Sequence, residues 1–261
     1  MIESNRIYKT GIIFVHFPEN GHHGCGKHCP FCLFDKLDYN IPVKPSDEEI
    51  LSFLRFVQLS GRVQICGAGD PLYNFEKNKD YLLHIIDVIH KAGYSVQIVT
   101  KYTEVVAEYL ETDLSVVDMW LFSVECKDTA ILSLIDKITK AGKNVRITKV
   151  ANFSSNLSEI NWDLLDDYVK FYSQVEQKYR FKICFRPNYN FTYLDSDVEC
   201  ARRRAEQIGE KYNCYVYMHA QSCHITIPQL WNGRLVPCGE TAKYIYEDMG
   251  LEFTGFGNYD N

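Results

Sequence analysis

Three cysteines stand close together near the start of the chain, in the run Cys25-Gly-Lys-His-Cys29-Pro-Phe-Cys32. The spacing is C-x3-C-x2-C, on a loop that Gly24 and Gly26 make conformationally permissive. Three thiolates in eight residues can converge on one metal centre, and cubane iron–sulfur clusters are normally held by cysteine thiolates. Three ligands for four irons leave one iron open, as catalytic metal sites do. The loop therefore predicts a metal centre that takes part in chemistry.

Two other interpretations of this loop stay open. Tetrahedral zinc could take the three cysteines with His22, His23 or His28 as a fourth ligand, although the spacing is unusual for zinc. Chance clustering of buried cysteines is the other interpretation, and the polar, glycine-rich character of the loop disfavours it.

Strand-like and helix-like segments alternate along the chain. Strands are expected at residues 11–17, 63–66, 94–100, 119–124, 144–150 and 181–186. Helices are expected at residues 46–59, 79–92, 103–111, 128–141, 157–177 and 196–212, with Ser46 as an N-cap and Gly93 and Gly142 as C-caps. Six strand–helix units in series predict parallel strands joined by right-handed crossovers, in an open doubly wound sheet or a partial barrel.

The alternation of side chains along the strands favours the barrel. One face of the strands is apolar, and the other carries Gln64, Ser123, Glu125, Arg146, Thr148, Lys182 and Arg186. A closed eight-stranded barrel fills its interior with branched apolar residues, so this polar set suits a wider, incomplete barrel around a polar ligand. Edge strands with one wetted face are the alternative.

The cysteine motif, with Phe31 before its last cysteine and directly after the first strand of a β/α chain, resembles the signature of the radical S-adenosylmethionine (SAM) superfamily. The resemblance covers about residues 9–190. It implies that Cys25, Cys29 and Cys32 hold a [4Fe–4S] cluster whose fourth iron binds the amino and carboxylate groups of SAM. It also implies an α/β fold, a partial (β/α)6 TIM-like barrel, expected here over residues 1–213. The implied chemistry is reductive cleavage of SAM to methionine and a 5′-deoxyadenosyl radical, which abstracts hydrogen from a substrate.

A second motif of that family, Gly-Gly-Glu-Pro after the second strand, is similar to Ala68-Gly69-Asp70-Pro71, although Ala68 and Asp70 depart from it. The resemblance implies that this turn contacts the amino group of SAM; on its own it is simply a turn. Ser123 and Glu125 end the fourth strand, where family members place polar groups near the ribose. Glu125 could equally be solvated or pair with Arg146 or Lys149.

Arginines on the fifth and sixth strands are further candidates. Arg146 with Thr148, and Arg186 with Asn188, could contact the SAM carboxylate or a substrate, because the guanidinium fork suits a carboxylate or a phosphate. An internal salt bridge is the alternative for either arginine.

The end of the chain carries a second group of cysteines. Cys223 and Cys238 bound the pattern C-x9-G-x4-C, and the Asn-Gly pair within Trp231–Arg234 predicts a hairpin turn. The pattern resembles the start of the SPASM and twitch extensions, which bind auxiliary iron–sulfur clusters. No cysteine follows Cys238, which excludes a full two-cluster SPASM domain; a single auxiliary cluster would recruit Cys214 or an upstream cysteine such as Cys184. We expect a small twitch-like β-hairpin extension over residues 214–261, with or without such a cluster.

Composition and charge argue against some binding partners and indicate the cellular compartment. The net charge of −6, from 28 basic and 34 acidic residues, disfavours general binding to nucleic acid or to an anionic membrane. No apolar stretch approaches the ~18 residues of a membrane span, and the N-terminus does not have the pattern of a signal peptide. Ten cysteines without an export signal indicate a reducing cytoplasm.

Together these features predict a cytoplasmic radical SAM enzyme that acts on a small polar molecule, a nucleotide or a peptide and takes electrons from a donor such as flavodoxin or ferredoxin. Three alternatives remain. The chain could be an activase for a glycyl-radical enzyme, or a non-catalytic zinc or iron–sulfur binding module. Asp70 in place of glutamate motivates the third alternative, a degenerate member that binds SAM without radical chemistry.

Overall fold

The computed structural model describes residues 8–15, 17, 25–32, 44–67, 69–188, 191, 193–219, 227–231 and 234–236. The chain forms two compact units, Met1–Asp118 with Cys223–Asn261, and Met119–Ser222. Both units alternate strands with helices, so the predicted α/β class is confirmed. No described helix combines the length and the apolar character that a membrane span requires.

The first unit is built on a sheet with the strand order β3-β2-β1-β8-β9. Its strands are β1 (Tyr8–Phe14), β2 (Val57–Cys66), β3 (Ser95–Thr100), β8 (Gln229–Trp231) and β9 (Arg234–Val236). Its helices are α1 (Asp47–Leu54), α2 (Phe75–Lys91), α3 (Thr103–Tyr109) and the 3₁₀ turn Asp113–Val116. Strands β1, β2, β3 and β8 run parallel, and β9 returns antiparallel to β8.

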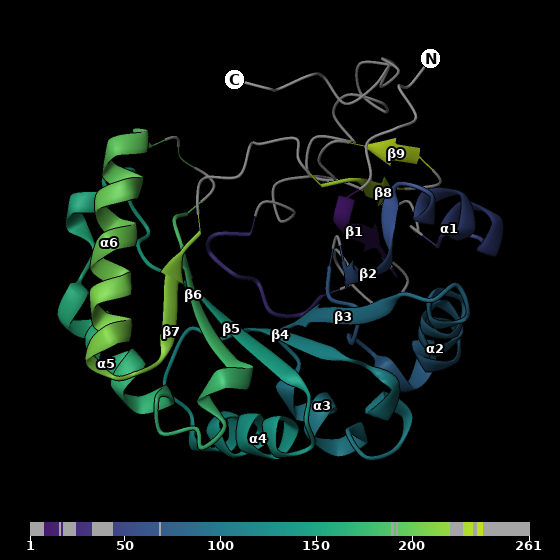
Figure 1. Ribbon diagram of the computed structural model, residues 1–261, viewed down its shortest axis with the longest axis horizontal. Coiled ribbons are helices and arrows are strands. Elements are labelled where there is room, and N and C mark those ends of the chain that lie inside the picture. Colours follow the sequence, from purple (N-terminus) through teal and green to yellow (C-terminus); the bar gives the residue numbers. More distant parts are fainter. Residues whose placement is uncertain are drawn as a thin grey trace. The chain divides into compact units, whose positions relative to one another are not determined.

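The second unit is built on four parallel strands in the order β7-β6-β5-β4. They are β4 (Met119–Ser123), β5 (Asn144–Val150), β6 (Phe181–Arg186) and β7 (Tyr215–Met218). Its helices are α4 (Thr129–Lys140), α5 (Trp162–Tyr172) and α6 (Asp195–Lys211), with 3₁₀ turns at Leu157–Glu159 and Lys178–Arg180. In Figure 1, α5 and α6 lie side by side, and β7 runs beside α6.

The two faces of the second unit's sheet differ in character, as the alternation predicts, although Lys149 lies on the apolar face and Leu121 on the polar face. Ile147, Ile183 and Phe185 are fully buried, and the ring of Tyr168 on α5 lies 6.2 Å from the ring of Phe185. The opposite face carries the polar side chains, because the strand register places Ser123 beside Thr148, and Arg146 beside Lys182. The polar face is therefore the one that α5 does not cover.

The expected helix boundaries are largely confirmed. Ser46 caps α1 with a reciprocal capping box to Glu49. Gly93 and Gly142 follow α2 and α4 at φ values of +89° and +85°, the left-handed region in which glycine is favoured at the ends of helices. Strands β5 and β6 coincide with the predicted ranges.

Three predicted helices were wrong in extent, and the one expected over residues 79–92 begins four residues earlier, at Phe75. The helix expected over residues 46–59 ends at Leu54, and Val57 begins β2 by pairing with Tyr8 of β1. The apolar spacing that suggested more helix comes instead from burial of Val57 in the sheet. The helix expected over residues 157–177 is interrupted, because the side chain of Asn161 accepts the backbone N–H of Leu164 and so starts α5 afresh.

The predicted C-terminal hairpin is present as β8 and β9, in which Trp231 pairs with Arg234. Its place in the sheet was not predicted: β8 lies parallel to β1, with Ile13 beside Leu230. The ring of Trp231 lies 5.1 Å from that of Phe14. The segment after residue 213 also supplies β7, which pairs with β6 in the second unit.

Candidate functional site

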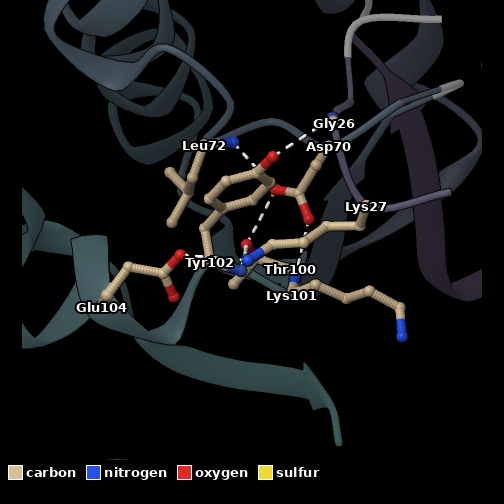
Figure 2. Close-up of polar contacts among 8 residues, drawn as sticks. All are labelled: Gly26, Lys27, Asp70, Leu72, Thr100, Lys101, Tyr102 and Glu104. Atoms are coloured by element: carbon tan, nitrogen blue, oxygen red, sulfur yellow. Dashed lines mark hydrogen bonds and ion pairs between the residues drawn. The ribbon is translucent and has the colours of Figure 1, made fainter.

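The cysteine loop and two other segments meet in the first unit, at the carboxyl ends of its parallel strands. The cysteine loop follows β1, the turn Gly67–Pro71 follows β2, and Thr100 to Tyr102 end β3 and lead into α3. The carboxyl ends of parallel strands lie at one edge of a sheet, where α/β proteins commonly bind ligands. Figure 2 shows the contacts that join the three segments.

The loop itself is folded by short-range hydrogen bonds. The backbone N–H of Cys32 donates to the carbonyl of Cys29 at 2.9 Å, and the Cys29 thiol donates to the carbonyl of Lys27 at 3.9 Å. His28 adopts the left-handed conformation with φ of 38°. These features turn the chain back on itself, and Cys25, Cys29 and Cys32 all remain partly exposed.

The three thiols interact with one another electrostatically. Burial raises the pKa of the Cys25 thiol to about 11; the backbone of Lys27 lowers it, and the charges of Asp70, Cys29 and Cys32 raise it further. The Cys25 thiol therefore feels the charges of the other two thiols and of Asp70. As placed, no three or more His, Cys, Asp or Glu side chains in the described ranges form a group that could hold a metal ion.

Tyr102 anchors the loop to the end of β3. Its hydroxyl accepts the backbone N–H of Gly26 at 3.2 Å, and the ammonium of Lys27 lies 4.3 Å from the centre of its ring (Figure 2). Lys27 also pairs with Glu104 on α3 at 3.1 Å. The ring of Tyr73, from the turn after β2, lies 5.7 Å from the ring of Tyr102. The loop thus rests on two tyrosines that follow two different strands.

Asp70 ties the turn after β2 to the end of β3. One of its carboxylate oxygens accepts the backbone N–H of Leu72 at 3.0 Å and the hydroxyl of Thr100 at 2.7 Å. The other accepts the backbone N–H of Lys101 at 2.7 Å (Figure 2). Burial raises the pKa of Asp70, while these three hydrogen bonds and the charge of Lys27 lower it, with the net shift upward. The side chain is therefore committed to contacts within the chain.

The network continues from Asp70 to the cysteine loop. The oxygen of the Thr100 hydroxyl accepts the backbone N–H of Tyr102 at 2.9 Å, so Asp70 and Tyr102 are linked through one side chain. The ammonium of Lys101 lies 5.1 Å from the centre of the Phe31 ring, inside the cysteine motif. Direct contacts thus connect Asp70 to Gly26 through Thr100 and Tyr102.

The turn after β2 is tight. A Cβ atom on Gly67 would lie 2.6 Å from the carbonyl oxygen of Gly69 and 2.9 Å from the nitrogen of Asp70, closer than real Cβ atoms approach. Pro71 is buried and Gly69 is partly exposed, while Ala68 lies outside the described residues. Among the described residues of this motif, only Gly69 is partly exposed and so accessible to a ligand.

The remaining predicted SAM contacts belong to the second unit. Ser123 and Arg146 are partly exposed on its polar face. Glu125 pairs with Lys149, whose ammonium lies 3.9 Å from its carboxylate and also donates to its backbone carbonyl. The same carboxylate accepts the backbone N–H of Val150 at 3.3 Å. Of the two cations considered as partners for Glu125, the structure selects Lys149.

The cysteines considered for an auxiliary cluster are only partly described. Cys214 is buried just before β7, and burial raises its pKa to about 11. Cys184 is buried on β6. Cys223 and Cys238 lie outside the described residues, so the auxiliary cluster stays a prediction.

Sequence reasoning missed four residues that hold the cysteine loop: Tyr73, Thr100, Tyr102 and Glu104. A positional signal was available. Thr100 ends the third predicted strand and Tyr102 and Glu104 follow it, as Asp70 follows the second, and residues at the carboxyl ends of successive parallel strands are neighbours.

Comparison with protein-family models finds no model that matches this chain, and comparison with curated proteins finds no similar sequence. The family resemblance therefore rests on the residues of the chain and their arrangement.

Proposed function

We propose that this protein is a radical SAM enzyme in which the loops after β1 and β2 bind the cofactors. The observation that carries the proposal is that the C-x3-C-x2-C loop and the segment after β2 both contact Tyr102, which follows β3. The proposal is also supported by the charge of Asp70, which raises the pKa of the Cys25 thiol. In this proposal the strands of both units belong to a partial (β/α)6 barrel.

The donor set fits an iron–sulfur cluster in kind and number. Cys25, Cys29 and Cys32 would hold a [4Fe–4S] cluster through their thiolates. Cys25 must lose its proton to bind iron, and the charge of the metal favours that loss despite the raised pKa of the thiol. Bound cluster and SAM together would supply one-electron reductive cleavage of the sulfonium.

The residues around the loop would orient the cofactors. The backbone of Ala68 and Gly69 would receive the amino group of SAM. Asp70 would hold that turn in place through Leu72, Thr100 and Lys101, because its carboxylate is already hydrogen-bonded to them. Tyr102 would hold the cysteine loop at Gly26. This division of roles accounts for an aspartate in place of the family's glutamate, since the shorter side chain reaches its partners within the fold.

The proposal is tested by anaerobic reconstitution of the full chain with iron and sulfide, followed by SAM and dithionite. Chromatography measures 5′-deoxyadenosine, and metal analysis measures iron and zinc. We expect iron and 5′-deoxyadenosine in the wild type and neither in the triple variant Cys25→Ala, Cys29→Ala, Cys32→Ala. The matched control replaces Cys126 and Cys200, both exposed and both outside the loop, and should behave as the wild type.

The alternatives give different results in the same experiment. Zinc in place of iron in the loop would identify a metal-binding module. Iron and SAM binding without 5′-deoxyadenosine, with no change of the cluster's electron paramagnetic resonance spectrum on adding SAM, would identify a chain that lacks radical chemistry. Product formation that survives in the triple-cysteine variant would refute the assignment of the loop.

A further inference from the structure

The polar face of the second unit's sheet concentrates positive charge on neighbouring strands. Arg146 on β5 lies beside Lys182 on β6 in the register, and Thr148, Cys184 and Tyr217 form the next row across β5, β6 and β7. Arg186 lies two residues beyond Cys184 on the same face of β6. Two guanidinium groups are thus placed on either side of the Cys184 row.

The Cys184 thiol reports that both guanidinium groups are close to it. Burial raises the pKa of Cys184, while the charges of Arg146 and Arg186 and hydrogen bonds with Tyr217 and Thr148 lower it. Arg146 also lowers the pKa of Tyr217, which burial raises. The strand register, together with these effects, groups the two arginines, the thiol and the two hydroxyl groups on one face of the sheet.

Arg146 has no acidic partner to balance its charge. It forms no ion pair within the described part of the chain, and its Nε atom is buried without a hydrogen-bond partner there. Glu125 contacts Lys149 and the N–H of Val150 through one carboxylate oxygen, and no ion pair joins Glu125 to Arg146. Buried polar groups in folded proteins are nearly always hydrogen-bonded, so an orphaned guanidinium N–H requires an explanation. The positive charges of Lys182 and Arg186 on the same face add electrostatic repulsion to this cost.

We propose that this face binds an oxyanion, a carboxylate or phosphate group of a small-molecule ligand other than SAM, between Arg146 and Arg186. The planar fork of an arginine matches both kinds of oxyanion and forms paired, charge-assisted hydrogen bonds with them. The hydroxyl groups of Thr148 and Tyr217 add neutral donors to the same site. An anion placed there would satisfy the Nε atom of Arg146 and offset the repulsion between the two arginines.

The site stands on the second unit alone and needs neither cluster nor SAM. If the proposed function holds, it identifies the substrate as an acidic small molecule; only that step rests on the proposed function. The anion site can therefore be tested in protein without the iron–sulfur cluster. A negative result would leave the assignment of that cluster to the cysteine loop untouched.

The experiment follows thermal unfolding of the cluster-free full chain in a reducing buffer. Sodium phosphate and sodium succinate are titrated separately, with sodium chloride holding the ionic strength constant. Selective binding to the folded chain raises the unfolding midpoint with ligand concentration. We expect such a rise with at least one of the two probes, and the probe that acts identifies phosphate or carboxylate as the preferred group.

Variants locate the site. Arg146→Gln should weaken apparent binding about tenfold or more, since a charged hydrogen bond contributes about 1.5–3 kcal/mol and 1.4 kcal/mol corresponds to tenfold. Arg146→Lys keeps the charge without the fork and should bind less tightly than wild type and more tightly than Arg146→Gln. The matched control is Arg204→Gln, which removes the same charge from the exposed surface of α6 and should leave binding unchanged. The midpoints without ligand show whether each variant folds.

Three results would overturn the proposal. Equal midpoint shifts in wild type and Arg146→Gln would mean that the anions act on the protein as a whole. The absence of a shift with either anion would remove the site. A midpoint rise that occurs with SAM but with neither phosphate nor succinate, and that depends on Arg146, would assign the two arginines to the carboxylate of SAM instead of a separate ligand.

Discussion

The backbone N–H of Gly26 donates a hydrogen bond to the hydroxyl of Tyr102, 76 residues further along the chain, at 3.2 Å. This contact joins the middle of the cysteine motif to the first residues after β3. Gly26 is exposed and the bond is single, so it positions the loop more than it stabilises the whole chain.

Tyr102→Phe removes this hydrogen bond and keeps the ring on which Lys27 rests. We expect amide hydrogen exchange at Gly26 and alkylation of Cys25 to accelerate roughly 2- to 10-fold, because one hydrogen bond contributes about 0.5–1.5 kcal/mol. Exchange and alkylation are read peptide by peptide by mass spectrometry. Tyr73→Phe is the matched control, since the ring of Tyr73 packs against that of Tyr102 but its hydroxyl does not accept from Gly26. Equal rates in the two variants would show that Tyr102 acts only through its ring.

Asp70→Asn replaces a buried acceptor of three hydrogen bonds with a group that can accept through one oxygen only. At least one N–H of Leu72 or Lys101, or the hydroxyl of Thr100, loses its acceptor, and we expect a loss of about 1–3 kcal/mol in the free energy of unfolding. Urea denaturation measures it. Asp80→Asn, on the exposed side of α2, should change stability by less than about 0.5 kcal/mol. If Thr100→Val in the Asp70→Asn background costs as much as it does alone, the two residues are not coupled.

The pH dependence of Cys25 alkylation tests the environment of the loop in metal-free protein. Because the thiolate is the reactive form, the rate should rise with a midpoint near the folded pKa of about 11, and near the ordinary value of 9.0 in urea. A thiol whose pKa is raised by folding contributes stability that is complete below pH 9.0 and is lost as the pH rises through about 11. Asp70→Asn should lower the midpoint, since the charge of Asp70 raises the pKa of Cys25. A folded-state midpoint at 9.0 would place the thiol in open solvent.

Gly67→Ala tests the tight turn after β2. The added Cβ would lie 2.6 Å from the carbonyl oxygen of Gly69, so the backbone must shift, and overpacking of this kind costs about 1–3 kcal/mol. Gly26→Ala is the comparison, because the nearest neighbour of its Cβ would be the Tyr102 hydroxyl oxygen at 3.5 Å, an ordinary contact. We expect Gly67→Ala to lower the unfolding midpoint and Gly26→Ala to leave it nearly unchanged. Equal unfolding midpoints for the two variants would mean that the turn can accommodate a Cβ at position 67.

The order of strands and helices could be predicted from the sequence because it depends on local properties. The capping box of Ser46 and the glycines at positions 93 and 142 act within a few residues, and each marked a real helix end. The period-2 alternation in β5 and β6 placed Arg146 and Lys182 on one face, and the register confirms that they are neighbours. The sequence also grouped Cys25, Cys29 and Cys32 through their spacing alone.

The contacts that hold the candidate site were decided by tertiary structure. Nothing near Tyr102 in the sequence pairs it with Gly26, and nothing near Asp70 pairs it with Thr100, since the partners lie 76 and 30 residues away. Glu125 had two cationic partners available in the sequence, and only the fold selects Lys149. The sequence by itself determined which residues are candidates for a metal and ligand site and near which strands they lie. The tertiary structure decided which of them meet, because parallel pairing brings the carboxyl ends of distant strands to one edge.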